Sequence, residues 1–349
     1  MCKNDCLSGC LRQKNNLSLF SFIKTMVTVT ILTPKYAVIQ GIASAQYLFK
    51  TINSFLESEG QPAKFNINLM GEETIVPVQE GSFQVKTDVL LSEPPKTDLL
   101  IIPPIYGNME DNLQLNKNFI PYIQKAYKEG AKIASLCTGV FLLAETGLLD
   151  QKKCSTHWAF YNLFKERYPH INIVDGGIIT VDNGIYSSGG ANSIWNLLLY
   201  LAEKYTNREM AIRASKYFAI DIHRNNQATF TIFEGQKNHQ DEEVKKLQTF
   251  VEKNYNAKLS VDELSEMVAM SRRNIERRFK KATHNTLAQY IQRVKVEAAK
   301  KLIESTRKNI GEVMLEVGYN DEKSFRNIFK KYVGVTPIDY KNKFVALYA

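Results

Sequence analysis

The last hundred or so residues of this 349-residue chain carry one helix pattern twice, and this repeat constrains the fold most. In the first copy, Ser260 to Glu263 has the spacing of a capping box at the start of a short amphipathic helix. After a short break, Ser271 can cap a second helix that has Ile275 and Phe279 on its apolar side and many Lys and Arg residues on the other. Two short helices, a tight turn and a cationic second helix predict a helix-turn-helix.

The second copy follows about fifty residues later. Gly318 to Asn320 breaks an apolar helix, and Asp321 can cap the next one. Phe325 and Phe329 stand four and eight residues after this cap, as the two apolar residues of the first copy do after theirs. Residues 287–304 between the copies predict one helix of roughly 27 Å. A spacer of this size suits two recognition helices on one face of a DNA duplex, where successive major grooves lie roughly 34 Å apart.

The exposed face of each second helix supplies candidate DNA-binding residues. Arg can donate two hydrogen bonds to guanine O6 and N7, and Glu can accept one from cytosine N4. Two alternatives remain: a solvated helix with surplus charge, or a second copy that mainly contacts the phosphate backbone. The candidates are Arg272, Arg273, Glu276 and Arg277 in the first copy, and Glu322, Lys323, Arg326 and Asn327 in the second.

The positive charge of the chain is confined to the same region. Residues 245–349 hold 22 Lys and Arg against 12 Asp and Glu, whereas residues 1–244 hold 23 against 24. This asymmetry predicts a polyanionic partner for the C-terminal part, and double-stranded DNA fits a compact helix pair better than a lipid surface does. No apolar run reaches 18 residues, so we expect no membrane span. Five cysteines, an odd number, indicate a reducing cytoplasm and no disulfide framework.

Residues 1–25 do not read as part of a fold, and we expect a disordered extension or a start of translation at Met26. Cys2, Cys6 and Cys10 recur every fourth residue, but without His or a second Cys pair they make only a weak metal motif. We expect neither a metal site nor a cofactor.

From Met26 onward, strand and helix patterns alternate, which predicts an α/β domain with a mostly parallel sheet covered by helices on both faces. The predicted strands are 27–32, 65–70, 97–103, 131–136, 171–174, 178–181 and 185–187, and the predicted helices are 39–59, 116–129, 193–205 and 209–218.

Cys137 follows a predicted strand and precedes Thr138, Gly139 and a helix. This order is typical of a nucleophile elbow, in which a turn raises one side chain above the carboxyl edge of the sheet. Ligands of open α/β sheets bind at that edge, and His157 has a plausible route to it. Three roles stay open for Cys137: a catalytic nucleophile, part of an effector pocket with His157, or a small buried side chain.

Residues 245–349 resemble the AraC/XylS-type DNA-binding domain. The resemblance rests on the residues Ser271–Phe279, Val317–Asp321, Phe325, Phe329 and Gly334–Tyr340. The first copy has Thr283-His-Asn285 where a glycine is common in that family, so its local turn departs from the family pattern.

The preceding residues resemble the PfpI-type superfamily, and the combination resembles the GlxA-type regulators. The residues that match are Cys137–Gly139, Leu148–Asp150, Thr156–Trp158, Asp175–Gly176 and Gly189–Gly190. In the enzymes of the superfamily, an acidic residue at the start of the first helix partners the cysteine. Here that region, Tyr36 to Gly41, holds Gln40 and no Asp or Glu.

The resemblance implies a flavodoxin-like α/β sandwich followed by an all-α domain with two helix-turn-helix motifs. The expected domains are 26–230 for sensing and dimerisation, a linker at 231–243, and 244–349 for DNA binding. The implied function is a bacterial transcription regulator that binds a small-molecule effector near Cys137, forms a homodimer and contacts RNA polymerase. Effector-pocket candidates are Cys137, Thr138, His157, Gln40, Gly189 and Gly190. The alternative is a cysteine-dependent hydrolase or hydratase that carries a DNA-binding domain.

Overall fold

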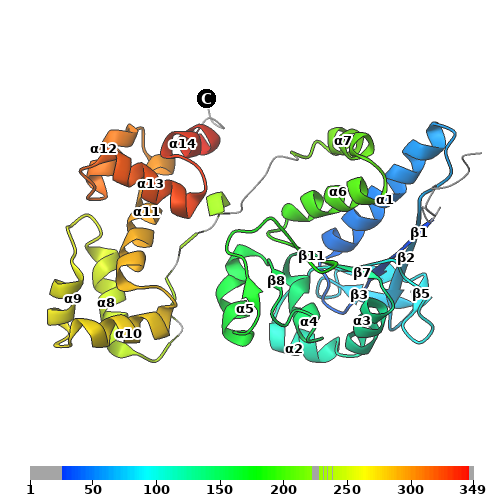
Figure 1. Cartoon of the computed structure of the whole chain (residues 1–349), viewed down its shortest axis with the longest axis horizontal. Coiled ribbons are helices and arrows are strands. Elements are labelled where there is room, and N and C mark those ends of the chain that lie inside the picture. The colour runs from blue at the N-terminus through cyan, green and yellow to red at the C-terminus, as the bar shows by residue number, and fades with distance from the viewer. Residues whose placement is uncertain (1–25, 222–227, 231, 234, 238, 346–349) are drawn as a thin grey trace, which may run out of the picture.

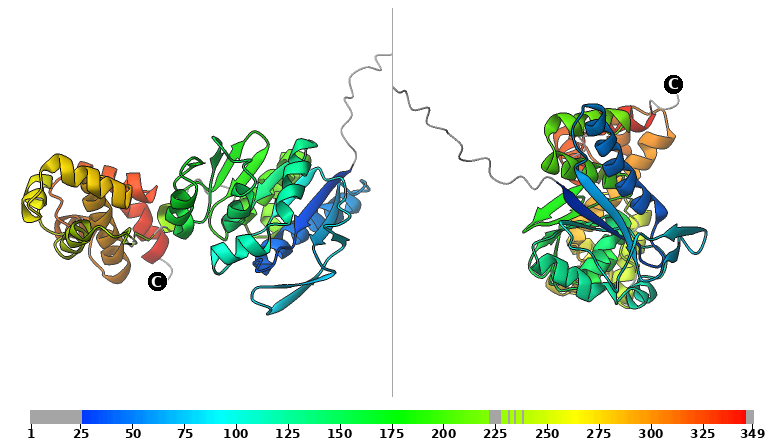
Figure 2. Two further views of the ribbon diagram at one scale, coloured as in Figure 1. Left: turned by 90° about the horizontal axis from the view of Figure 1, so that it is seen from below. Right: turned by 90° about the vertical axis from the view of Figure 1, so that its right-hand side faces the viewer.

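The computed structural model describes residues 26–221, 228–230, 232–233, 235–237 and 239–345. The extension predicted for residues 1–25 lies outside these ranges. Figures 1 and 2 show an α/β body followed along the long axis by a helical body.

The α/β body is built on a sheet of seven described strands, in the order β10-β11-β7-β6-β1-β2-β5. Neighbouring strands run parallel, except for the hairpin of β10 and β11. The strands are β1 (Val27–Leu32), β2 (Phe65–Gly71), β5 (Val89–Leu90), β6 (Leu99–Ile102), β7 (Lys132–Ser135), β10 (Ile179–Asp182) and β11 (Ile185–Ser188). The prediction of a mostly parallel sheet is confirmed.

Helices cover both faces of this sheet (Figure 1), and each face buries its own apolar cluster. One face carries α1 (Ile39–Ser58), α6 (Ser193–Tyr205) and α7 (Arg208–Tyr217). The other carries α2 (Met109–Leu115), α3 (Phe119–Lys128), α4 (Val140–Ala144) and α5 (Tyr161–Arg167). The flavodoxin-like α/β architecture is thus present.

One local prediction for this domain was wrong, and some short strands were missed. The helix predicted from residue 116 begins at Phe119, because the buried Asn116 amide exchanges two hydrogen bonds with the backbone of Lys35 instead of extending the helix. Short strands also escaped the sequence pattern. They are the hairpin of β3 (Ile75–Val78) and β4 (Phe83–Lys86), and β8 (Lys153–Cys154), which pairs with β9 (Asn172–Ile173), the strand predicted as residues 171–174.

The C-terminal body is all helical and has two apolar cores, both of which receive residues of the long helix α11. The first core holds Ile275 and Phe279, and the second holds Phe325 and Phe329, as predicted. The helices are α8 (Glu242–Lys253), α9 (Val261–Met267), α10 (Arg272–Thr283), α11 (Leu287–Ser305), α12 (Ile310–Glu316), α13 (Glu322–Val333) and α14 (Pro337–Val345).

The segment that precedes α8 packs against these helices along its described length. Thr229 donates to the carbonyl of Val333 over 3.0 Å, and Gln236 accepts from the amide of Asn285 over 3.1 Å. The chain therefore joins the helical body before the start of α8. Among the described residues, no helix combines the length and apolarity that crossing a membrane requires.

Candidate nucleic-acid interface and candidate effector crevice

The first helix-turn-helix consists of α9 and α10, and its ends are capped as the sequence predicts. Ser260 and Glu263 form a capping box at α9, and the hydroxyl of Ser271 accepts from the backbone of Asn274 at the start of α10. Between them Ala269 takes a left-handed conformation with φ +50°. The turn thus reverses the chain within a few residues.

The second helix-turn-helix consists of α12 and α13. Asn309 and Glu312 form its capping box, and the carboxylate of Asp321 accepts from Ser324 at the start of α13. Gly318 holds the left-handed position of the turn with φ +75°. The predicted second motif is therefore confirmed.

The duplication extends beyond the motifs to the helices that support them. Tyr290 and Tyr340, fifty positions apart, each donate a hydroxyl to a glutamate, Glu252 or Glu304. Their rings meet the core phenylalanines edge-on at 5.1 and 5.6 Å, with interplanar angles of 77° and 78°. Two equivalent units thus present two equivalent second helices.

The turn that lacks a glycine also forms. His284 ends α10 in a left-handed conformation with φ +56°. The amide of Asn285 donates to the carbonyl of Thr283 over 2.8 Å and to Gln236. Side-chain hydrogen bonds therefore support the turn around a residue that is not glycine.

The predicted DNA-binding residues lie on the outer faces of the two second helices. Arg272 pairs with Asp262 at 3.3 Å and with Glu276 at 3.5 Å, and Arg277 donates to the side chain of Asn274. Glu276 is half-buried, and the other seven candidates are exposed. The candidates of the second helix are Glu322, Lys323, Arg326 and Asn327.

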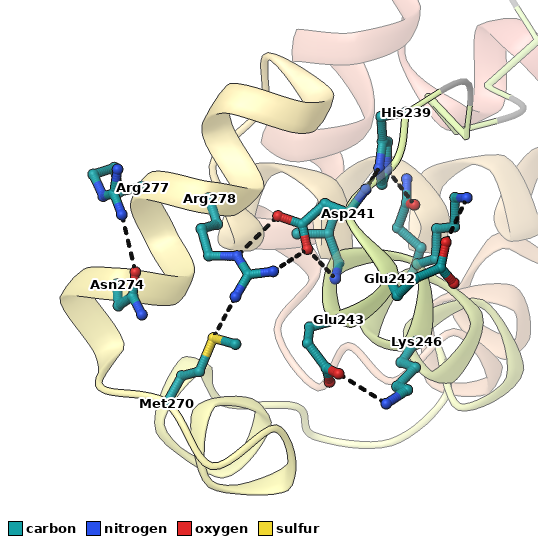
Figure 3. A network of polar contacts seen from close by, with 12 residues as sticks. His239, Asp241, Glu242, Glu243, Lys246, Met270, Asn274, Arg277 and Arg278 are labelled. Atoms are coloured by element: carbon teal, nitrogen blue, oxygen red, sulfur yellow. Dashed lines mark hydrogen bonds and ion pairs between the residues drawn. The ribbon is translucent and has the colours of Figure 1, made fainter.

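Arg278 has a different role. Its guanidinium donates to both carboxylate oxygens of Asp241, over 2.8 and 2.6 Å (Figure 3). This contact lowers the pKa of Asp241 below its usual value and raises the pKa of Arg278. Arg278 directly precedes the buried Phe279, and this position could have distinguished it from the cations of the outer face.

In the α/β domain, Cys137 stands at the carboxyl end of β7, as predicted. It takes φ +55° and begins a 3-10 turn (Cys137–Gly139) that leads into α4. A Cβ at Gly139 would lie 2.5 Å from the carbonyl oxygen of Pro103, so only glycine allows this turn to approach β6 so closely. The strained conformation is that of a nucleophile elbow.

The thiol itself is poorly suited to nucleophilic chemistry. Its residue is 6% exposed, and burial raises the pKa of Cys137 to about 12, although hydrogen bonding to Thr138 opposes the shift. The thiol is therefore protonated near neutral pH, whereas the nucleophile is the thiolate. Thr138 is also engaged, because its hydroxyl bonds to both backbone groups of Ile105.

The other crevice candidates are held by local contacts. The imidazole of His157 accepts from the backbone of Ala159, lies tilted against the ring of Trp158 and meets the ring of Phe160 edge-on, and burial lowers the pKa of His157. Gln40 is exposed in the first turn of α1, which contains no acidic residue. None of the hydrogen bonds found among the described residues joins Cys137 to His157.

Two residues that the sequence reading missed do reach Cys137. Ser188 accepts from its backbone nitrogen over 3.2 Å, and Thr156 donates to its carbonyl over 3.3 Å. Each lies next to a predicted candidate, Gly189 and His157 respectively, and Gly189 donates to the carbonyl of Ile178. The elbow is thus bonded to both predicted segments through their neighbours.

Gly190 is half-buried and accepts from the backbone of Ser193 over 2.7 Å at the start of α6.

A large cavity lined by described residues lies away from this elbow. It has a volume of about 1260 Å³ and lies between α5, residues 235–243 and α10. Among the described residues no group of three or more His, Cys, Asp or Glu is arranged to hold a metal. Cys2, Cys6 and Cys10 are outside the described residues.

Comparison with known proteins agrees with this division of the chain. A helix-turn-helix domain model matches residues 264–343, and the DJ-1/PfpI family model matches residues 49–204. The chain therefore joins a DJ-1/PfpI domain to an AraC-type helix-turn-helix domain, as the sequence motifs predicted.

Its relatives include named transcriptional regulators. The chain is 24% identical to the regulator GbdR of Pseudomonas aeruginosa over 257 residues, which cover 73% of this chain and 69% of GbdR. It is 22% identical to the regulator GlxA of Rhizobium meliloti over 231 residues, which cover 62% of this chain and 66% of GlxA. DJ-1β of Drosophila melanogaster superposes with a TM-score of 0.47 and 15% identity, covering 56% of this chain and 99% of DJ-1β.

Proposed function

We propose that this protein is a sequence-specific DNA-binding transcription regulator that responds to a small molecule. The observation that carries this proposal is the paired helix-turn-helix unit, which presents two recognition helices with exposed cationic faces. The named relatives support it, since they are transcriptional regulators.

The base contacts would come from α10 and α13. In α10, Arg272, Arg273 and Arg277 reach guanines and Glu276 reaches a cytosine. In α13, Lys323, Arg326 and Asn327 read the second half-site with Glu322 beside them. Arg272 would exchange its partner Asp262 for DNA, because an exposed ion pair contributes little stability.

The spacing of the two helices provides the test. A DNA fragment selected from a random pool by the full chain should hold two half-sites about 10 bp apart. Inserting about 5 bp between them turns the second half-site to the opposite face and should remove most of the specific affinity, as measured by fluorescence anisotropy. Unchanged affinity would contradict the two-helix model. Binding should also weaken steeply with salt as counterions are released.

For the α/β domain, we propose an effector site at the elbow, with Cys137, Thr138, His157, Gln40, Gly189 and Gly190 as candidate lining residues. The strained turn at Cys137 supports this proposal, since such strain occurs at ligand sites. Cys137→Ala should leave DNA binding intact and abolish the response to the effector, while His157→Ala tests whether the imidazole takes part. The assay is DNA binding with and without a cell extract and candidate metabolites.

Catalysis by Cys137 is the alternative, and the structure gives it little support. The thiol is buried with a raised pKa, and the first turn of α1 carries no acid. Turnover of a metabolite by the purified chain, lost in Cys137→Ala, would establish the enzyme instead.

The remaining features of the proposal follow the family. We propose a cytoplasmic homodimer in which residues 26–230 sense and dimerise, residues 231–243 connect, and residues 244–349 bind DNA. RNA polymerase is the proposed partner in transcription.

A further inference from the structure

The α/β domain and the DNA-binding domain meet at an ion pair between Asp175 and Arg293. Asp175 lies in the loop between β9 and β10, and its Oδ2 is 3.4 Å from Nη2 of Arg293. Arg293 lies on α11, the helix that joins the two helix-turn-helix motifs, and its guanidinium packs over the rings of Phe233 and Tyr332 at 5.6 and 4.9 Å. One arginine therefore contacts the α/β domain, the connecting segment and the second motif.

A second feature brings the α/β domain beside the first recognition helix. The cavity of about 1260 Å³ has α5 on one side, with Leu163 and Glu166, and α10 on the other, with Arg277 and Lys281. Arg277 is one of the residues proposed to read bases. The α/β domain thus stands along one flank of α10.

We infer that this docked arrangement restricts DNA binding, and that the Asp175–Arg293 contact is the latch whose release the effector controls. The inference rests on the proposed function, since it assumes that α10 enters DNA. A recognition helix lies in a major groove about 12 Å wide, so phosphates pass along both of its flanks. Where α5 stands, those phosphates would meet the Glu166 side and lose access to Lys281.

The latch has the properties of a contact that opens readily. The side chain of Arg293 is 26% exposed and that of Asp175 is 57% exposed, and ion pairs that reach solvent contribute little stability. The Nε of Arg293 is buried without a hydrogen-bond partner among the described residues, so docking leaves this guanidinium incompletely satisfied. Breaking this contact therefore costs little free energy.

The loop of Asp175 is also connected to the Cys137 elbow. Val174, the residue before Asp175, donates to the carbonyl of Cys154 over 2.8 Å. Thr156, two residues after Cys154, donates to the carbonyl of Cys137. A ligand that moves the elbow would shift the strand pair β8–β9, and β9 ends at Ile173, two residues before Asp175. A physical connection thus joins the proposed effector crevice to the latch.

The test compares the full-length chain with Asp175→Asn, which keeps the shape of the side chain and removes its charge. Affinity is measured by anisotropy on a DNA fragment selected by the wild type, at constant salt. We expect Asp175→Asn to bind about two- to five-fold more tightly, the range of an exposed ion pair. The double variant Asp175→Asn/Arg293→Gln should bind like Arg293→Gln alone, because both changes remove the same contact.

The control is Glu129→Gln at the C-cap of α3. It removes an exposed charge whose ion pair, at 3.9 Å, is with Lys125 of the same helix. Small-angle X-ray scattering without DNA gives an independent readout, in which Asp175→Asn should increase the radius of gyration and Glu129→Gln should not. Equal affinity and equal radius in Asp175→Asn and the control would overturn the latch, as would weaker binding by Asp175→Asn. Failure of the wild type to select any DNA would overturn the proposed function, while the scattering experiment would still decide whether the latch exists.

Discussion

The two helix-turn-helix motifs have the same backbone conformation at equivalent positions, but different residues occupy those positions. The turn after the first helix is left-handed at Ala269 in one motif and at Gly318 in the other, and the second helix ends left-handed at His284 and at Gly334. The left-handed conformation is unfavourable for a residue with a Cβ atom, whereas glycine, which has no Cβ, adopts it readily. The first motif therefore stores backbone strain at two positions where the second does not.

The motifs also differ in what holds them. The recognition helix of the first is bonded through Arg278 to Asp241, at the end of the segment that leads from the α/β domain. At the position that corresponds to Arg278, fifty residues later, the second motif has the apolar Ile328. The second motif is instead held by the buried Lys295, which donates to the carbonyl of Val317 over 2.9 Å. The first motif is thus bonded to the segment that precedes α8, whereas the second is bonded to the long helix α11.

The largest effect is expected from exchanging the residues of the two turns. A Cβ at Gly318 would lie 2.4 Å from the carbonyl oxygen of Asn256, in a conformation that also strains alanine. Gly318→Ala should lower the free energy of unfolding by about 2–4 kcal/mol, and Ala269→Gly should change it by less than about 1 kcal/mol. Urea denaturation measures both. An equal loss of stability in Gly318→Ala and Ala269→Gly would show that the methyl group of Ala269 makes a stabilising contact, and that the two turns are therefore not equivalent.

The next comparison concerns base reading. Arg277→Ala and Arg326→Ala should each weaken binding by about 1–3 kcal/mol and relax the preference at one or two base pairs. Repeating the selection from random DNA with each variant measures this. If Arg326→Ala instead weakens binding to all sequences equally, the second motif grips the backbone and only the first reads bases.

A smaller effect should separate the motifs by pH. The bond from Arg278 depresses the pKa of Asp241, so its stabilisation is present above the ordinary carboxyl pKa and is lost as pH falls through the lower folded value, below about pH 4. Asp241→Asn keeps a residue suited to capping α8 but removes the ion pair. Urea midpoints between about pH 2 and pH 6 should converge for wild type and variant at the acid end. A constant difference would assign the stabilisation to packing.

Local sequence determined most of what could be predicted. Caps such as Ser271 and Asp321 and the helical spacing of Phe325 and Phe329 are short-range signals, and the helices they predict are present. Contacts between segments distant in sequence were not visible. Asn116 ends a helix by bonding Lys35, 81 residues away, and the Asp175–Arg293 pair spans 118 residues. The effector-pocket candidates were chosen by motif and stay predictions, and the burial that raises the pKa of the Cys137 thiol depends on the assembled sheet.

The smallest effect concerns the end of the recognition helices. His284 has φ +56° where Gly334, fifty positions later, has φ +81°. Histidine tolerates this conformation better than most residues, and Asn285 supports the turn, so relief of strain by His284→Gly is partly offset by the entropy that glycine adds to the unfolded chain. We expect a gain of a few tenths to about 1 kcal/mol in urea denaturation, and a loss of similar size for Gly334→Ala. Because His284 also lines the cavity facing α5, destabilisation by His284→Gly would mean that its imidazole contributes to domain docking, and the first motif would then be strained in exchange for that contact.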